Sequence, residues 1–372
     1  MNKEQKNWLI IGVVVIIVLI VFYMIAGSSP QEETIKIGAI LPLTGIASIH
    51  GQNERQGIDL AVKEINEAGG INGKPIEIIY EDDQTNPAKS LISYNKLIDV
   101  NGVEVVIGGT WDILANAIIP ESEKKQVVIL SPSALPDTLE QESPYFFSMH
   151  SPVAVNQEVF EKFIIDNAIE RVGIIVVNNP WGLAHLDTFK KAIENTDATV
   201  VEERILQSFD NNDISTDLSI LKDLDVDSIF VTINFNDMAL FGKKRIELGI
   251  GSKILAHSNF ASSIEAGRLS IELSEGVTIF RFSEPSQEFI EKFSLEYGKT
   301  PEIYSDIAYD TVYVIKNAIE KYGYSSDGII RGLREVDLSG TSGQIYFGNN
   351  NYPANKQPVL EIISNGEFVV LE

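Results

Sequence analysis

The stretch Ile35–Glu81, IKIGAILPLTGIASIHGQNERQGIDLAVKEINEAGGINGKPIEIIYE, decides the fold of this chain. It begins with an apolar, β-rich run that Pro42 and Gly45 end. A loop is expected at Thr44–Gln52, and apolar residues at helical spacing follow it. The pair Gly69–Gly70 can adopt the left-handed backbone angles that end a helix, and a second apolar run follows at Ile76–Tyr80. Strand, helix and strand in this order predict a β-α-β unit of a buried parallel sheet.

The same alternation of short apolar runs and amphipathic segments continues along the chain and restarts once. Buried strands are expected at Val103–Gly108 and Val127–Leu130, with amphipathic helices around them. A crossover near Ser151 precedes the restart, so we predict an α/β protein with two doubly wound parallel-sheet lobes. Helical spacing predicts a helix at Ser305–Tyr322, and the pair Asn365–Gly366 predicts the turn of a terminal hairpin.

The composition narrows the class of protein. A chain of 372 residues is too long for one ordinary compact domain and fits two lobes plus an anchor. The formal net charge of −24 argues against nucleic acid as a partner, because phosphates would be repelled. The absence of cysteine excludes disulfides, zinc-thiolate sites and thiol nucleophiles, and it also excludes the lipid-modified cysteine that anchors many bacterial surface proteins.

The amino-terminal segment is an uncharged apolar run, Trp8–Ala26, with the length that spans a hydrocarbon core. We interpret residues 8–26 as a transmembrane signal anchor and residues 27–34 as a short polar linker. Lys3 and Lys6 precede the run, which puts the amino terminus in the cytoplasm and the folded body on the extracytoplasmic side of the cytoplasmic membrane. The alternative is a signal peptide cleaved near the small residues that follow the run.

No catalytic motif is present in the sequence. It lacks the G-x-S-x-G, H-E-x-x-H and G-x-G-x-x-G patterns of common hydrolases, zinc proteases and dinucleotide-binding proteins. The four histidines are far apart in sequence and have no metal-ligand spacing; they are His50, His150, His185 and His257. We therefore expect no catalytic residue, metal or cofactor, with a histidine-and-carboxylate site assembled by the fold as the open alternative.

Several motifs in order along the chain resemble one known family. LPLTG, AVKEINEAGGING and EDDQTNP lie in the opening stretch and just after it, and VVIGG, VVILSPSA and VGIIVVNNPWG follow later. Together they resemble the type I periplasmic solute-binding proteins of the leucine/isoleucine/valine-binding family, over essentially everything after Pro30. The resemblance implies a receptor of an ABC importer whose chain passes three times between the lobes through a hinge. The implied lobes are 35–151 plus 283–356 and 152–282 plus 357–372.

A two-lobed α/β protein without catalytic groups can close on a small molecule by hinge motion. Loops at the carboxyl ends of the strands are where open α/β sheets bind ligands, and here they are rich in Asn, Ser, Thr and Trp. We therefore predict that a small solute contacts His50, Trp111, Asp112, Ser131, Ser133, Ala134, Trp181, Asn234, Ser258 and Tyr304.

The resemblance also shows departures from the family at this site. It places Asp112 where a carboxylate-binding Ser is common, Leu135 at a usual Thr and Ser258 at a usual acid. It places aromatic wall positions at His50, Trp181 and Tyr304. Asp112 would repel a ligand carboxylate by about 4 kcal/mol for a close pair at an effective dielectric of about 20. A ligand with an amine, amide or hydroxyl facing Asp112 therefore fits better than a standard branched-chain amino acid.

Each of these residues also has a structural alternative. Asp112 is well suited to cap a helix that begins at Ile113. Trp181 follows Pro180 in an expected loop before a helix at Leu183–Asn195, and its ring would line the ligand site or pack into the core. Trp111 can pack against the sheet edge, and Asn234 can brace a turn.

The sequence supports one function over two rivals. We expect a membrane-anchored extracytoplasmic solute-binding protein that captures an amino acid, amide or similar solute and delivers it to an ABC permease and its ATPase. The first rival is an extracytoplasmic sensor that signals through a separate membrane partner. The second is an enzyme or a closed structural pair of lobes. Permease and ATPase genes beside this gene favour the importer, and a neighbouring kinase or chemoreceptor gene favours the sensor.

Overall fold

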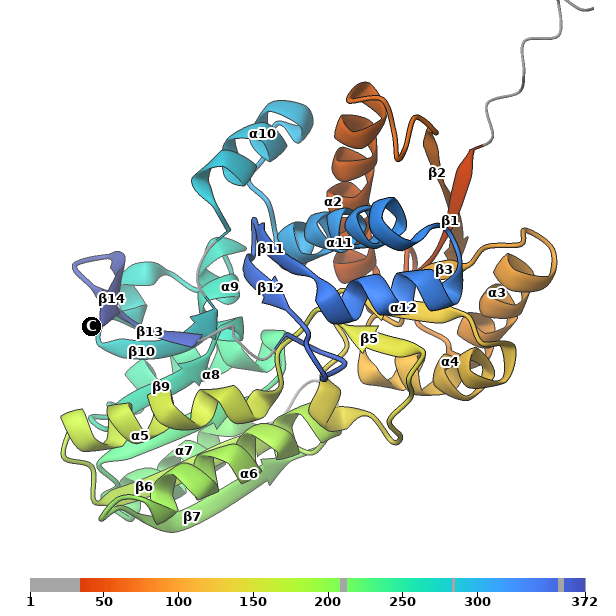
Figure 1. Ribbon diagram of the computed structural model, residues 1–372. Helices are drawn as coiled ribbons and strands as arrows, with labels where there is room; N and C mark the ends of the chain where they lie inside the picture. The colour runs from red at the N-terminus through yellow and green to blue at the C-terminus, as the bar shows by residue number, and fades with distance from the viewer. Residues whose placement is uncertain (1–33, 208–212, 283–284, 354–357, 372) are drawn as a thin grey trace, which may run out of the picture.

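The computed structural model describes residues 34–207, 213–282, 285–353 and 358–371. These residues form two α/β lobes, each built on its own sheet (Figure 1). The expected anchor at 8–26 and residues 27–33 of the expected linker lie outside the described residues. Within the described ranges, no helix is both long enough and apolar enough to cross a membrane.

The first lobe contains a parallel sheet in the order β2-β1-β3-β4-β5. Its strands are β1 Ile35–Leu41, β2 Ile76–Asp82, β3 Val105–Gly108, β4 Val128–Ser131 and β5 Phe146–Ser148. One face packs against α2 Ser48–Glu67, α10 Gln287–Tyr297, α11 Ser305–Tyr322 and α12 Ser326–Glu335. The other face packs against α3 Pro87–Asp99 and α4 Asp112–Lys125. Because helices cover both faces, the central strands are buried along nearly their whole length.

The second lobe contains a sheet in the order β14-β13-β10-β9-β8-β6-β7. The parallel strands are β6 Arg171–Val177, β7 Thr199–Leu206, β8 Ser228–Thr232, β9 Lys253–His257 and β10 Val277–Phe282. The antiparallel hairpin of β13 Pro358–Ser364 and β14 Glu367–Leu371 extends it beside β10. One face packs against α5 Gln157–Asp166 and α6 Pro180–Glu194. The other packs against α7 Ile214–Asp223, α8 Phe235–Glu247 and α9 Asn259–Glu265.

Sheet membership shows how the chain moves between the lobes. It leaves the first sheet after β5, passes through the short helix η2 Val153–Asn156 and enters the second lobe. After β10 it returns to the first lobe as α10 to α12 and the hairpin of β11 Asp337–Gly340 and β12 Gly343–Tyr346. It then joins the second sheet again through β13.

The predicted helix Ser305–Tyr322 and the terminal hairpin that turns at Asn365–Gly366 are confirmed. The expected starting positions of two helices are wrong. The helix α2 begins at Ser48, inside the stretch interpreted as a loop, and α6 begins at Pro180 rather than at Leu183. His50 and Trp181 therefore lie in first helical turns and not in loops. The sequence interpretation also missed α9, β10 and α12.

Candidate functional site

The candidate site lies where the carboxyl ends of the parallel strands of both lobes converge. Parallel pairing aligns the ends of β1, β3 and β4 in the first lobe and of β6, β8 and β9 in the second. The ring of His150, on the crossover after β5, lies 5.6 Å from Phe282 at the end of β10 and 6.4 Å from Tyr304 at the start of α11. Groups from both lobes and from a crossover between them thus meet in one place.

In the first lobe, three predicted residues form one aromatic wall. The indole Nε1–H of Trp111 donates a hydrogen bond of 2.8 Å to His50 Nδ1, and the ring of Tyr304 lies edge-on to His50 at 5.2 Å. Trp111 and Tyr304 both have positive φ, 67° and 71°, which is rare for bulky residues and is concentrated at functional sites. Burial lowers the pKa of His50 to about 4, so this imidazole is neutral near pH 7.

Close packing of two helices positions this wall. A Cβ atom at Gly57 of α2 would lie only 2.0 Å from the carbonyl oxygen of Ser305 at the start of α11. The missing side chain therefore lets α11 approach α2, which brings Tyr304 against His50.

We expect Gly57→Ala to lower the free energy of unfolding by about 2 kcal/mol, because α11 must move away from α2. Urea denaturation measures this change. Gly251→Ala is the matched control, since a Cβ there meets nothing within 4 Å, and its expected effect is within about 0.5 kcal/mol. Equal midpoints for Gly57→Ala and the wild type would show that the helices do not depend on this contact.

A buried carboxyl lies behind the wall. Glu54 of α2 has an exposed fraction of 0%, and it accepts hydrogen bonds from Thr110 Oγ1 at 2.6 Å and from Ser133 Oγ at 2.5 Å. Burial raises the pKa of Glu54 to about 7, while these two hydroxyl groups act against the rise. The sequence interpretation missed this residue, although Glu54 precedes Ile58 by one helical turn on the buried face of α2.

The loop after β4 is more deeply buried than the sequence suggested. Ser131, Ser133 and Ala134 are each at most 3% exposed. Ser131 Oγ donates to the carbonyl of Gly109 at 3.1 Å and accepts from the backbone N–H of Ala134 at 3.0 Å. In this structure the hydroxyl groups of both serines thus hold neighbouring loops together and connect the loop to Glu54.

Asp112 is the first residue of α4 and is half-buried. The N-cap of this helix is Trp111, so the alternative in which Asp112 caps the helix is wrong. Burial is the largest cause that raises the pKa of Asp112, and hydrogen bonds from the Ile113 backbone and the Thr138 side chain oppose it. A carboxylate in a first helical turn also interacts favourably with the helix dipole.

The second lobe provides a matching set of rings. Trp181, in the first turn of α6, packs edge-on against His257 at 4.8 Å and lies 5.2 Å from His185. The ring N–H of His185 at Nδ1 donates to the carbonyl of Trp181 at 2.9 Å, while His257 Nδ1 accepts from the backbone N–H of Asn259 at 3.2 Å. Burial lowers the pKa of His185 to about 4 and that of His257 well below its usual range.

Asn234 and Ser258 occupy the N-cap positions of α8 and α9. Neither side chain makes a capping hydrogen bond, and both residues are half-buried. The hydroxyl of Ser258 lies 3.3 Å from His257 Nδ1, so Ser258 joins the group around Trp181.

The four histidines are distant in sequence but not in the fold. His50 lies in the first lobe, His150 on the crossover after β5, and His185 and His257 in the second lobe with ring centroids 5.2 Å apart. Parallel strands bring their carboxyl ends together whatever the sequence separation, so the spacing of the histidines was misleading. Among the described residues, no group of three or more His, Cys, Asp or Glu has the geometry to hold a metal ion.

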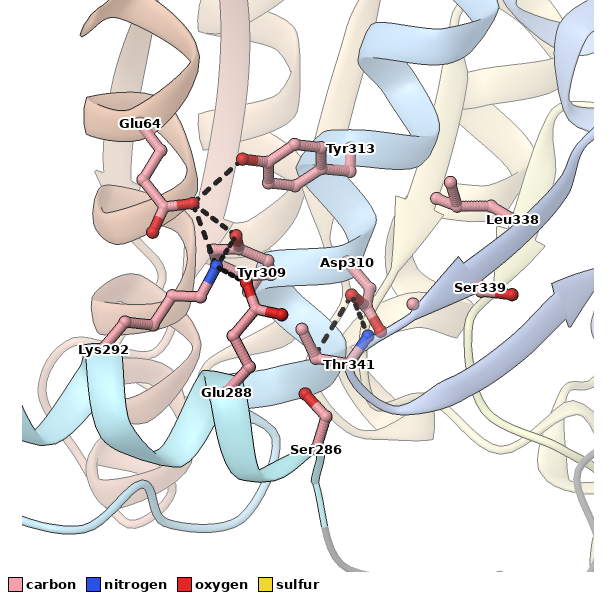
Figure 2. Close-up of a pocket in the computed structure, with 11 residues that line it drawn as sticks. Glu64, Ser286, Glu288, Lys292, Tyr309, Asp310, Tyr313, Leu338, Ser339 and Thr341 are labelled. Atoms are coloured by element: carbon pink, nitrogen blue, oxygen red, sulfur yellow. Dashed lines mark hydrogen bonds and ion pairs between the residues drawn. The ribbon is translucent and has the colours of Figure 1, made fainter. Parts of the chain in front are cut away.

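A separate hollow of about 350 Å³ lies between α2, α10, α11 and the β11–β12 hairpin (Figure 2). Lys292 points toward Tyr309 and Glu64, with Nζ 2.8 Å from the phenol oxygen and 3.4 Å from the carboxylate. Glu64 also accepts from Tyr313, and the buried Asp310 accepts from the backbone of Thr341. These charged groups join helices to one another, roughly 21 Å along α2 from the wall at His50.

Comparison with known proteins gives a family. A model of the family described as "Periplasmic binding protein" matches residues 34–367. The leucine-, isoleucine-, valine-, threonine- and alanine-binding protein of Pseudomonas aeruginosa is 24% identical over 336 residues, which cover 87% of this chain and 88% of the relative.

Solved structures have the same fold. The branched-chain amino acid transporter substrate binding protein LivJ of Streptococcus pneumoniae, in complex with isoleucine, aligns with a TM-score of 0.80 at 23% identity and covers 91% of this chain and 99% of that one. A solute binding protein of an ABC transporter from Rhodopseudomonas palustris, in complex with 3,4-dihydroxy benzoic acid, aligns with a TM-score of 0.81 at 22% identity and covers 91% and 97%. Since the family model spans nearly the whole described body, this chain belongs to the periplasmic binding protein family, a family of solute-binding proteins rather than enzymes.

Proposed function

We propose that this chain is the solute-binding protein of an ABC importer, which captures a small polar solute between its lobes and delivers it to a permease and its ATPase. The observation that carries the proposal is that His150, on the crossover after β5, lies near an aromatic wall of each lobe: its ring is 6.4 Å from Tyr304, and it is close enough to His257 to affect the pKa of that ring. The curated relative from Pseudomonas aeruginosa is named for amino-acid binding, and the solved relatives hold isoleucine or a dihydroxybenzoic acid.

Closure of the lobes would bring the two walls onto opposite sides of the solute. The wall of His50, Trp111 and Tyr304 belongs to the first lobe, and the wall of Trp181 and His257 belongs to the second. A solute between them gains contacts with both only in the closed state, so its binding energy favours closure.

We also propose that the first lobe comprises residues 35–151 plus 283–356 and the second lobe residues 152–282 plus 357–372. The three chain crossovers between the lobes form the hinge, and residues 8–26 form the membrane anchor.

Hydrogen bonds at the crossovers support a hinge there. Ser151 Oγ donates to the carbonyl of Pro353 at 2.9 Å, which joins two of the passages between lobes. The backbone N–H of Val153 donates to Asp137 Oδ2 at 2.6 Å, which ties the start of the second lobe to a loop of the first. Both contacts lie beside the peptide bonds that would rotate during closure.

The decisive experiment is a thermal-shift screen of the full chain in detergent with amino acids, amides, polyamines and aromatic acids. A binder at 100 times its dissociation constant stabilises the folded protein by about 2.7 kcal/mol. For the best binder, we expect Trp181→Ala to weaken the affinity at least tenfold, because one wall of the site is lost.

Tyr346→Ala is the control for this variant, since it removes an aromatic ring that is 51% exposed on β12. It is expected to leave the affinity unchanged. An affinity within twofold of the wild type for Trp181→Ala would place the solute elsewhere. Uptake of the binder by vesicles that contain the permease and ATPase separates the importer from the sensor, which predicts closure without uptake.

A further inference from the structure

The loops that converge at the candidate site contain no Lys or Arg. They do contain acids, including Asp112 and Asp137; a third acid, Glu302, is paired with Lys299 at 2.9 Å, just before its loop. The loops without a basic residue are 42–47, 109–112, 132–139, 149–154, 178–182, 233–237, 257–260 and 300–305. Burial lowers the pKa of His50, His185 and His257, which keeps these three rings neutral near pH 7. The protein therefore offers negative charge to a bound solute without a balancing cation from these loops.

The aromatic wall of the first lobe is backed and flanked by carboxyl groups. Asp112 follows Trp111 directly in the chain, and this residue is half-buried. The buried Glu54 lies behind the same wall, close enough to Tyr304 to raise the pKa of that phenol further. A positive group on this side of the site would be attracted by ionised Asp112 and by the ionised fraction of Glu54, whose pKa is about 7, and a carboxylate would be repelled by the same charges.

The rings at the site suit a cation as well. Trp and Tyr bind cations through the negative faces of their rings, and Trp binds them best. Among the described residues, the cation–π pairs within the protein use rings of Tyr or Phe elsewhere, such as Arg55 over Tyr80 and Arg268 over Phe235. The rings of Trp111, Trp181 and Tyr304 appear in none of these described pairs. Two of these rings, Trp111 and Tyr304, thus lie near acidic residues, and none of the three has a cationic side chain over it in the described pairs.

From this arrangement we propose that the site takes a small organic cation without a carboxylate, such as an alkylammonium or quaternary ammonium ion. The positive group lies against Asp112 and the ring of Trp111, and Trp181 covers it from the second lobe. This assignment rests on the proposed function, because the cation is still a solute captured between the lobes. It excludes benzoate and the zwitterion leucine as preferred ligands, since either would bring a carboxylate to an acidic site.

Calorimetric titration of the full chain in detergent tests the assignment. The cationic probes are choline, tetramethylammonium, butylammonium and putrescine, and the comparison probes are leucine and benzoate. We expect at least one cation to bind at least 100-fold more tightly than leucine and benzoate. Asp112→Asn is expected to weaken the binding of that cation at least tenfold. Asp166→Asn is the control, because Asp166 lies in the last turn of α5 and pairs with Lys162, and it is expected to leave the affinity unchanged.

A second pair of variants separates a cation–π contact from simple packing. Trp111→Phe and Trp111→Leu both lose the hydrogen bond to His50, but only the Phe variant keeps a ring. The Phe variant is expected to bind the cation at least fivefold more tightly than the Leu variant. Equal affinities for the two variants would show that the ring does not recognise the charge and would overturn the assignment.

Two further outcomes distinguish this inference from the proposed function. Tight binding of leucine or benzoate that Trp181→Ala abolishes would leave the solute-binding function in place and overturn the cation assignment. A lack of response to all six probes would count against both.

Discussion

Glu54→Gln is expected to raise the free energy of unfolding by about 3 kcal/mol at pH 8 and to change it little at pH 5. The folded-state pKa of Glu54 is about 7, above its ordinary value of 4.5. As the pH rises from 4.5 to 7, the unfolded state loses this proton first, so the stability of the wild type falls across that window and stays lower above it. Glutamine carries no charge and avoids this loss.

Urea denaturation at pH 5, 6, 7 and 8 measures the difference between Glu54→Gln and the wild type. Glu67→Gln is the control, because Glu67 is an exposed residue near the end of the same helix. Its effect is expected to stay within about 0.5 kcal/mol at every pH. If the difference in the free energy of unfolding between Glu54→Gln and the wild type stayed constant from pH 5 to pH 8, Glu54 would be ionised in the folded protein throughout this range.

His185→Phe is expected to make the protein more resistant to acid. Burial lowers the folded-state pKa of His185 to about 4, below its ordinary value of 6.5. As the pH falls from 6.5 to 4, the unfolded state gains the proton first, so the stability that this histidine provides at neutral pH is lost. Between pH 7 and pH 5 the wild type should lose about 2 kcal/mol more than the variant.

Phenylalanine is the suitable replacement because a ring is kept beside Phe280 and His257. The variant loses the hydrogen bond to the carbonyl of Trp181, which lowers stability by about 1 kcal/mol at every pH and leaves the pH dependence untouched. Chemical denaturation at pH 5, 7 and 8 tests this, and the two proteins should show the same change between pH 7 and pH 8. If the free energies of unfolding of the variant and the wild type changed with pH in the same way down to pH 5, this would contradict a neutral, buried His185.

Short sequence patterns predicted the helices and turns that depend on interactions between residues close together in the chain. The helix Ser305–Tyr322 has a regular apolar face, and Asn365–Gly366 can adopt the positive φ angles that the hairpin turn requires. The start of α2 was wrong because Gly51 resembles a loop residue. In the structure its missing side chain lets the first turn pack against the backbone of Pro42, where a Cβ atom would lie 2.5 Å from the carbonyl oxygen.

The candidate site was harder to predict because it depends on which strand ends meet. Aromatic residues beside strand ends, such as Trp111 and Trp181, could be found from the sequence because large rings are unusual in exposed connections. The cluster of histidines could not, since only the lobe arrangement brings His150 near His185 and His257. Glu54 carried a local signal, an acid on the apolar face of an amphipathic helix, but its hydroxyl partners come from two distant loops.

The two indoles of the described body lie on opposite lobes, Trp111 on the first and Trp181 on the second, each in edge-on contact with an imidazole. The emission of an indole depends on the polarity around it, so any motion that dries or wets these rings changes the intrinsic fluorescence. The protein thus contains one intrinsic fluorescent probe in each lobe. Replacing Trp8 together with either Trp111 or Trp181 by phenylalanine would let the signal of each lobe be followed separately during closure.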